Sequence, residues 1–300
     1  MAEQIDRVGV VGLGAMGMGI AQSLLRAGLE VHACDVRDEA VRALVAQGGH
    51  AAASPAELAG RVDAMLIVVV NAAQTEQVLF GENGAASQLK RGSVVIANAT
   101  VAPEFAEALG ARLLGMGLRF IDAPISGGAA KAATGQMSVM AAGAPDTFDA
   151  CTRIFDAICA KLYRLGDQPG QGSKVKMINQ LLAGVHIAAA AEAMALGLRA
   201  GCDPDALYEV ISNSAGSSWM FQNRVPHILK GDYTPLSAVN IFVKDLGIVL
   251  DYAKKSVFPL PLSATAHQMF MQASAAGYGG EDDSAVVKTF PGITLPGSRP

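Results

Sequence analysis

The chain has 300 residues, of which 51% are hydrophobic and 17% charged, and its formal net charge is −4 at pH 7. This length suggests about two domains, and the slightly acidic balance gives no basic surface for nucleic acid. We therefore expect no nucleic-acid partner. The four cysteines form no CxxC pair, and the segment before the first predicted strand is too short for a signal peptide. These features predict reduced thiols and a cytoplasmic location.

The N-terminal segment 7–35 is typical of a strand, a glycine turn, a helix and a second strand. Residues 7–11 and 31–34 are short apolar runs, residues 16–25 have helical character, and the sequence between fits G-x-G-x-x-G. Gly12 permits the tight turn, Gly14 lets a pyrophosphate approach the backbone, and Gly17 lets the helix pack on the strand. The helix N-terminus favours bound phosphate. We predict a dinucleotide site formed by Gly12, Leu13, Gly14, Ala15, Met16 and Gly17.

Asp35 bears on which dinucleotide binds. It ends the second strand, 18 residues after Gly17, close to the spacing of about 20 expected for a carboxylate that contacts the ribose. Such a carboxylate repels a 2′-phosphate, so the sequence favours NAD over NADP. Arg37 keeps NADP open because an arginine there can pair with that phosphate, although a solvated loop charge is the favoured interpretation.

Short apolar runs and helical segments alternate up to residue 165. We expect strands at 65–70, 93–97, 119–122, 138–142 and 161–165, with helices at 39–46, from 55, from 75, at 103–114 and at 145–158. This alternation predicts an α/β Rossmann-type, doubly wound and mostly parallel sheet, forming an NAD-binding domain over residues 1–168. Because ligands of such sheets bind outside the carboxyl ends of strands, Asn71, Thr100 and Ser126 are expected at the site, with Asn71 on the cofactor.

The pattern changes after Gly166, where strand signals end. Helices are expected at 174–200, 204–212, 239–254 and 261–276, which predicts an all-α C-terminal domain over residues 169–300 for substrate binding and oligomerisation. The alanine-rich run 181–198 contains His186 and Glu192, so a buried helix is favoured over a membrane span. A helix that is apolar on nearly all sides needs partners all round it. We therefore expect a homodimer or homotetramer that does not bind membranes.

Lys176 and Asn179 lie three residues apart in the first of these helices and therefore share a face. The neighbours of Lys176 are Val175, Met177 and Ile178. Dry surroundings lower the pKa of a lysine toward the range of an acid–base catalyst. Lys176 is thus a candidate general acid or base, and a solvated charge is the alternative.

Four motifs make the chain resemble the β-hydroxyacid dehydrogenase family over nearly its whole length. They are GLGAMGMGIA at 12–21, DAPISGG at 122–128, GQGSKVKMINQ at 170–180 and FVKDLGIV at 242–249. The resemblance implies that Lys176 transfers the proton and that Asn179 orients the substrate. It also implies that Ser126, Gly127 and Gly128 bind the substrate carboxylate, and that Thr100 and Lys244 lie near the cofactor.

Two positions depart from the family pattern: Gln180 replaces a common asparagine, and Asn98 a common acidic residue. They argue against a hydroxyisobutyrate enzyme, and the run 258–288 resembles a branch that oxidises a four-carbon sugar acid. His267 in that run contacts either a substrate hydroxyl or another subunit.

The expected activity is therefore NAD-dependent oxidation of a small anionic hydroxy acid, without a metal. One alternative is an NAD(P)H-dependent reductase of a small semialdehyde such as tartronate semialdehyde, succinic semialdehyde or glyoxylate, or a 3-hydroxyisobutyrate dehydrogenase. A second is a dinucleotide-binding interaction module without catalysis, against which the retained Lys176 argues.

Overall fold

The computed structural model describes residues 4–297, and its contacts divide the chain into two compact units, Met1–Lys176 and Met177–Pro300. The division falls inside helix α9 (Gln171–Arg199), whereas the sequence placed the domain boundary at 168/169. The first turn of α9 stays with the first unit because Gly170 and Ser173 donate backbone hydrogen bonds to Asp122, which ends a strand of the sheet.

The first unit contains a mostly parallel sheet with the strand order β3-β2-β1-β4-β5-β6-β8-β7, and β9 pairs with β8. The strands β1 to β6 run parallel, and β8 runs antiparallel to β6 and β7. This confirms the predicted doubly wound sheet. The strands are β1 (Arg7–Val11), β2 (Glu30–Cys34), β3 (His50–Ala51), β4 (Ala64–Ile67), β5 (Val94–Ala97), β6 (Arg119–Asp122), β7 (Ile125–Ser126), β8 (Met137–Gly143) and β9 (Cys159–Arg164).

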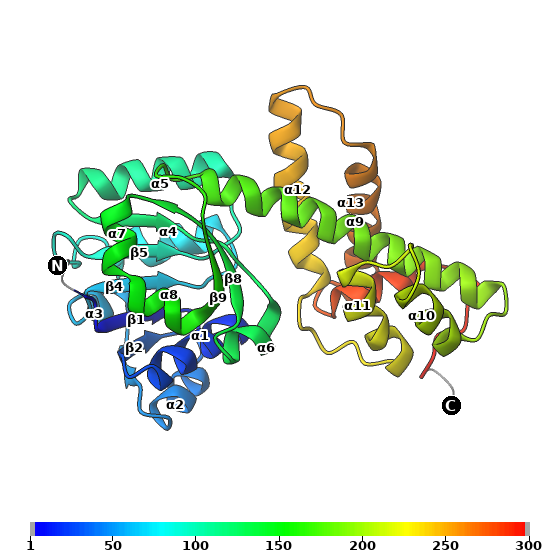
Figure 1. The fold of residues 1–300 in the computed structure, drawn as a ribbon, viewed down its shortest axis with the longest axis horizontal. Coiled ribbons are helices and arrows are strands. Elements are labelled where there is room, and N and C mark those ends of the chain that lie inside the picture. The colour runs from blue at the N-terminus through cyan, green and yellow to red at the C-terminus, as the bar shows by residue number, and fades with distance from the viewer. Residues whose placement is uncertain (1–3, 298–300) are drawn as a thin grey trace. The chain divides into compact units, whose positions relative to one another are not determined.

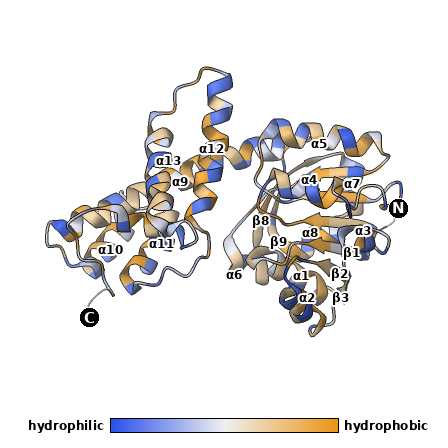
Figure 2. Ribbon diagram, turned by 180° about the vertical axis from the view of Figure 1, so that it is seen from behind, coloured by the Kyte–Doolittle hydropathy of each residue, from blue (hydrophilic) through white to orange (hydrophobic). Residues whose placement is uncertain are grey.

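Helices cover both faces of this sheet (Figure 1). Val8 and Val10 of β1 belong to one hydrophobic core and Val11 to the other, because successive side chains of a strand point to opposite faces. The strands are accordingly rich in hydrophobic residues (Figure 2). The helices are α1 (Ala15–Arg26), α2 (Asp38–Val45), α3 (Pro55–Ala59), α4 (Ala72–Phe80), α5 (Pro103–Gly115), α6 (Gly128–Ala133), α7 (Pro145–Ala150) and α8 (Thr152–Ile158).

Several predicted elements of this unit have different bounds, and for two of them the structure shows the cause. The strand predicted to reach Val70 ends at Ile67. The backbone N–H of Val68 still donates to the carbonyl oxygen of Val11, but the carbonyl of Val68 then lies against Gly12 of the glycine-rich loop and strand pairing stops. The single helix predicted at 145–158 is divided at Cys151, whose φ and ψ of −96° and 11° leave the helical range.

The second unit is helical, as predicted. Helix α11 was not predicted, because Pro226 interrupts its pattern, yet Ser218 caps it by accepting a hydrogen bond from the backbone of Phe221. The elements after α9 are α10 (Pro204–Ser212), α11 (Trp219–Lys230), α12 (Val239–Lys255), α13 (Pro261–Ala273), the π-helical turn η1 (Ser274–Tyr278) and the 3₁₀ segment η2 (Asp283–Thr289).

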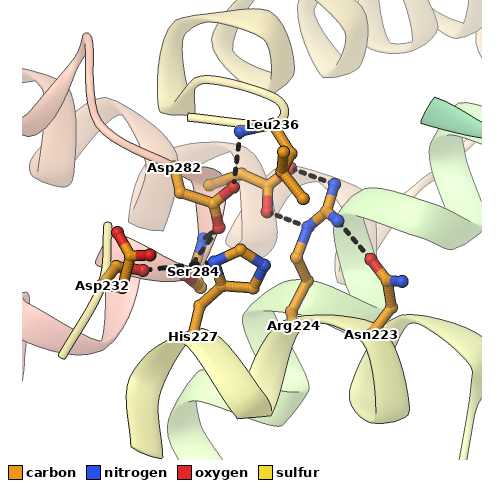
Figure 3. Close-up of polar contacts among 8 residues, drawn as sticks. Asn223, Arg224, His227, Asp232, Leu236, Asp282 and Ser284 are labelled. Carbon is orange, nitrogen blue, oxygen red and sulfur yellow. Dashed lines mark hydrogen bonds and ion pairs between the residues drawn. The ribbon is translucent and has the colours of Figure 1, made fainter. Parts of the chain in front are cut away.

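A buried ion pair fastens η2 to α11 in this unit. Arg224 donates to both carboxylate oxygens of Asp283, at 2.5 and 3.1 Å, and the neighbouring Asp282 accepts hydrogen bonds from Leu236 and Ser284 (Figure 3). Burial raises the pKa of Asp283 to about 6, although the paired guanidinium of Arg224 opposes the rise. The pair thus fixes the C-terminal segment at some cost in desolvation.

Helix α9 is apolar on two faces with different surroundings. Among the described residues it is the one helix long and apolar enough to cross a membrane by length and composition, which core helices also satisfy. Ile187 and Met194 lie in the core of the second unit. In contrast, Ile178, Leu182 and Leu196 are 52%, 50% and 68% exposed. Within residues 4–297, these three side chains on one side of α9 are therefore left largely uncovered.

Candidate active site

The glycine-rich loop joins β1 to α1 where the strand order reverses. Because β1 lies between β2 and β4, the loop opens at the switch point where doubly wound sheets bind ligands. Gly12 has a φ of +93°, and a Cβ on it would lie 2.5 Å from the carbonyl oxygen of Val68. Only glycine fits this turn.

Gly14 and Gly17 are required for different reasons. A Cβ on Gly17 would lie 1.8 Å from the carbonyl oxygen of Gly12, so Gly17 serves the packing of α1. A Cβ on Gly14 would meet no protein atom within 4 Å. Gly14 is the N-cap of α1 without a side-chain cap, and it is exposed together with Ala15. The fold does not need glycine at this position but a pyrophosphate at the helix N-terminus does, so the loop fits a dinucleotide.

Asp35 lies at the end of β2 and is already held by the loop. It accepts hydrogen bonds from the backbone of Leu13 at 2.5 Å, and from the backbone and Nε of Arg37 at 2.8 and 3.1 Å. Burial alone would raise the pKa of Asp35, but these hydrogen bonds outweigh it and hold the pKa below its usual range. Arg37 also donates to the carbonyl oxygen of Leu13 at 2.9 Å. Its side chain is 59% exposed, so Arg37 is a solvated charge that is also paired with Asp35.

Three further polar residues follow strands of the sheet. Asn71 caps α4 by accepting a hydrogen bond from Gln74 at 2.9 Å, and Thr100 follows β5. Asn98, directly after β5, is buried and donates to the carbonyl oxygen of Ala123 at 2.8 Å. A carboxylate cannot donate this bond, which explains why the chain has asparagine at position 98.

The segment predicted to bind the substrate carboxylate lies between β7 and α6. Gly127 and Gly128 have φ values of +138° and +74°, and a Cβ on Gly128 would meet nothing within 4 Å. Helix α6 packs on α1 because Gly19 of α1 lacks a side chain, whose Cβ would lie 2.6 Å from the backbone nitrogen of Ala133. Ser126 directly precedes Gly127 and Gly128. The helix that follows them, α6, packs against α1, which starts at the glycine-rich loop.

Asp122 is a buried site residue that the sequence analysis did not identify. Its carboxylate accepts hydrogen bonds from the backbones of Gly170 and Ser173 at 3.0 and 2.8 Å, and from the hydroxyl of Ser173 at 2.7 Å. Burial raises the pKa of Asp122, although the bonds from Ser173 and Gly170 oppose the rise. The sequence could have indicated Asp122 by its position, because it is the first residue of the DAPISGG motif and the last residue of a buried strand.

The turn of α9 that follows this anchored start carries Lys176, which is 5% exposed. Its sequence neighbours Val175 and Ile178 point into solvent, 44% and 52% exposed, because successive residues of a helix point about 100° apart. They therefore do not desolvate Lys176 as the sequence suggested, whereas Met177 is buried. Asn179 lies one turn further along and shares a face with Lys176.

The second unit contains a chain of polar contacts of its own. Lys244 pairs with the buried carboxylate of Asp245, Gln180 donates to Asp245 at 2.5 Å, and Asn179 donates to Gln180 at 3.0 Å. Two residues predicted to act on substrate or cofactor, Asn179 and Lys244, are thus linked through one carboxylate.

His267 has a role that the sequence did not predict. Its Nε2 lies 3.0 Å from the carbonyl oxygen of Val243, so it joins α13 to α12 within the chain. The substrate and subunit contacts proposed from the sequence stay predictions.

The described residues include no group of three or more His, Cys, Asp or Glu side chains that could hold a metal ion.

Sequence models of two domain families match the chain. They are the NAD-binding domain of 6-phosphogluconate dehydrogenase over residues 7–166, and the NAD-binding domain of NADP-dependent 3-hydroxyisobutyrate dehydrogenase over residues 170–290. L-Threonate dehydrogenase of Cupriavidus necator is 67% identical over 97% of this chain and 98% of that protein. The chain belongs to the β-hydroxyacid dehydrogenase family.

Other members of the family match this dehydrogenase over similar lengths. L-Threonate dehydrogenase of Escherichia coli (strain K12) is 54% identical over 97% of each chain. The crystal structure of a 3-hydroxyisobutyrate dehydrogenase from Salmonella typhimurium has a TM-score of 0.91 and 55% identity, covering 95% of this chain and 99% of that chain. The family confirms the predicted dehydrogenase activity and the use of NAD or NADP, with a Rossmann-type sheet followed by an all-helical part.

Proposed function

We propose that the chain oxidises L-threonate, a four-carbon sugar acid, to 2-dehydro-L-erythronate with NAD. The observation that carries the proposal is the buried Lys176, on a helix whose start is pinned to the sheet by Asp122 and whose next turn carries Asn179. The substrate is supported by the relatives at 67% and 54% identity that bear this activity in their names.

Oxidation of an alcohol removes a hydride from carbon and a proton from oxygen, and bound NAD supplies the hydride acceptor. In its neutral form Lys176 accepts the hydroxyl proton at Nζ. Asn179 orients the substrate by hydrogen bonding. The hydroxyl of Ser126 and the backbone N–H groups of Gly127 and Gly128 hold the carboxylate, which fixes the reacting carbon.

The preference for NAD over NADP rests on Asp35. Its carboxylate is ionised, because its pKa is held low, and it faces the position of the adenosine ribose in this motif. A 2′-phosphate would meet this charge. Arg37 already pairs with Asp35, so recruiting it to the phosphate would break that pair. Asn71, Thr100 and Lys244 would complete the cofactor site, with Thr100 on the nicotinamide side.

The exposed apolar face of α9 supports assembly of the chain in the cytoplasm as a homodimer or homotetramer. Ile178, Leu182 and Leu196 lie on that face, and a second copy would remove them from water. In this arrangement residues 1–168 bind the dinucleotide, and residues 169–300 complete the substrate site and form the subunit contacts. Light scattering at micromolar concentration tests this, and a monomer would contradict it.

A 3-hydroxyisobutyrate dehydrogenase is the second candidate, because the Salmonella protein with 55% identity bears that name. Steady-state kinetics with L-threonate, other four-carbon sugar acids and 3-hydroxyisobutyrate, each with NAD and NADP, separates the two. Reduction of small semialdehydes with NADPH belongs in the same panel. We expect the highest kcat/KM for L-threonate with NAD, and a higher value for any other pair would contradict the proposal.

A further inference from the structure

Gln180 lies at the centre of the polar chain between α9 and α12. Its Nε2 donates to Oδ2 of Asp245 at 2.5 Å, and its Oε1 accepts from Nδ2 of Asn179 at 3.0 Å. The other oxygen of Asp245 is paired with Lys244. Gln180 and Asp245 are both buried, so these contacts are protected from competing water.

The direction of every hydrogen bond in this chain follows from the carboxylate. An ionised Asp245 only accepts, so Gln180 must present its amino group to it. The carbonyl oxygen of Gln180 then faces Asn179, which in turn must donate. This assigns both amide orientations, which are otherwise ambiguous. The Oδ1 of Asn179 therefore points away from Gln180 as an acceptor.

We propose that Gln180 is a positioning residue. Because Asp245 fixes the orientation of the Gln180 amide, Gln180 in turn fixes that of Asn179, so that Oδ1 of Asn179 accepts a hydrogen bond from a substrate hydroxyl. The inference rests on the proposed function, in which Asn179 orients the substrate. An asparagine at position 180 has one methylene less to span the distance to Asp245. The glutamine is thus the element that couples Asn179 to Asp245 and, through that carboxylate, to Lys244.

The test removes the carboxylate at position 245, which only accepts hydrogen bonds, and then restores a carboxylate at position 180. In Asp245→Asn, residue 245 can donate, Gln180 can reverse and Asn179 loses its fixed orientation. In the double variant Asp245→Asn/Gln180→Glu, the carboxylate at 180 again only accepts, so Asn179 must donate to it as in the wild type. We expect kcat/KM for L-threonate, with NAD saturating, to fall at least tenfold in Asp245→Asn and to return within about threefold of wild type in the double variant.

Two further variants keep the test decisive. Gln180→Met breaks the link to Asn179 but leaves the pair of Lys244 and Asp245, and it should lose activity like Asp245→Asn even if the latter folds poorly. Asp251→Asn, at an exposed position on the same helix, is the matched control and should retain activity. Melting temperatures are measured alongside.

Wild-type kcat/KM in Gln180→Met would overturn the inference. A double variant that melts like the wild type without recovering kcat/KM would do the same. An inactive wild type would instead contradict the proposed function, so the two failures are distinguishable.

Discussion

Gly14→Ala should weaken dinucleotide binding without a comparable loss of stability. The reason is that a bound pyrophosphate requires glycine at position 14, whereas the fold does not. The backbone of Gly14 has a φ of −60°, which alanine adopts freely, and its Cβ would meet no protein atom within 4 Å. The loss of a favoured N-cap residue costs at most about 1 kcal/mol. The methyl group would occupy the space that a pyrophosphate needs, so the NAD dissociation constant should rise at least tenfold, or about 1.4 kcal/mol.

Gly17→Ala provides the contrast and Gly115→Ala the control. A Cβ on Gly17 would lie 1.8 Å from a carbonyl oxygen, which forces the backbone to move at a cost of about 1–3 kcal/mol or more. Gly115 is exposed at the end of α5, and its Cβ would meet nothing within 4 Å. Calorimetric titration with NAD and thermal unfolding measure the two effects. Tight NAD binding by Gly14→Ala would refute the reasoning.

Three further predictions concern carboxylates. Asp35→Ala should narrow the ratio of kcat/KM for NAD over NADP about tenfold by removing the repulsion of a 2′-phosphate, and an unchanged ratio would contradict this. Asp122→Ala should lower kcat at least tenfold with unchanged NAD affinity, because the start of α9 loses its anchor; calorimetry and turnover decide. Burial raises the pKa of Asp283 from 3.8 to about 6, so its stabilising contribution is present below 3.8 and is lost as pH rises through 6. The stability of wild type relative to Asp283→Asn, from urea unfolding, should therefore fall between about pH 4 and pH 6 and stay level above that, and a rise would contradict it.

The elements that the sequence predicted are those with a local pattern. The glycine loop, the buried parallel strands and the helices with Pro at their first position, such as α10, are specified by neighbouring residues. Helix α11 was missed because Pro226 hides its pattern, and the end of β4 was misplaced because the apolar run continues to Val70 after pairing stops.

The contacts that complete the site could not be predicted because they join distant positions. Asp122 and Ser173 are 51 residues apart, and Gln180 and Asp245 are 65 apart. The motifs flagged these stretches without indicating which side chains would meet. His267 shows the same limit, because its partner is a backbone carbonyl, which leaves no mark in the sequence.

The turnover of L-threonate by Lys176→Ala tests the central claim most directly, with Lys174→Ala as the matched control. Lys174 is exposed and pairs with Glu107 at 2.8 Å, so its loss should leave turnover unchanged. Loss of a general base should lower kcat in Lys176→Ala at least 100-fold, or about 3 kcal/mol, with unchanged NAD affinity. Wild-type oxidation should accelerate as pH rises, because only the neutral amine accepts a proton. Near-normal turnover in Lys176→Ala, with the same pH dependence as the wild type, would remove Lys176 from the mechanism.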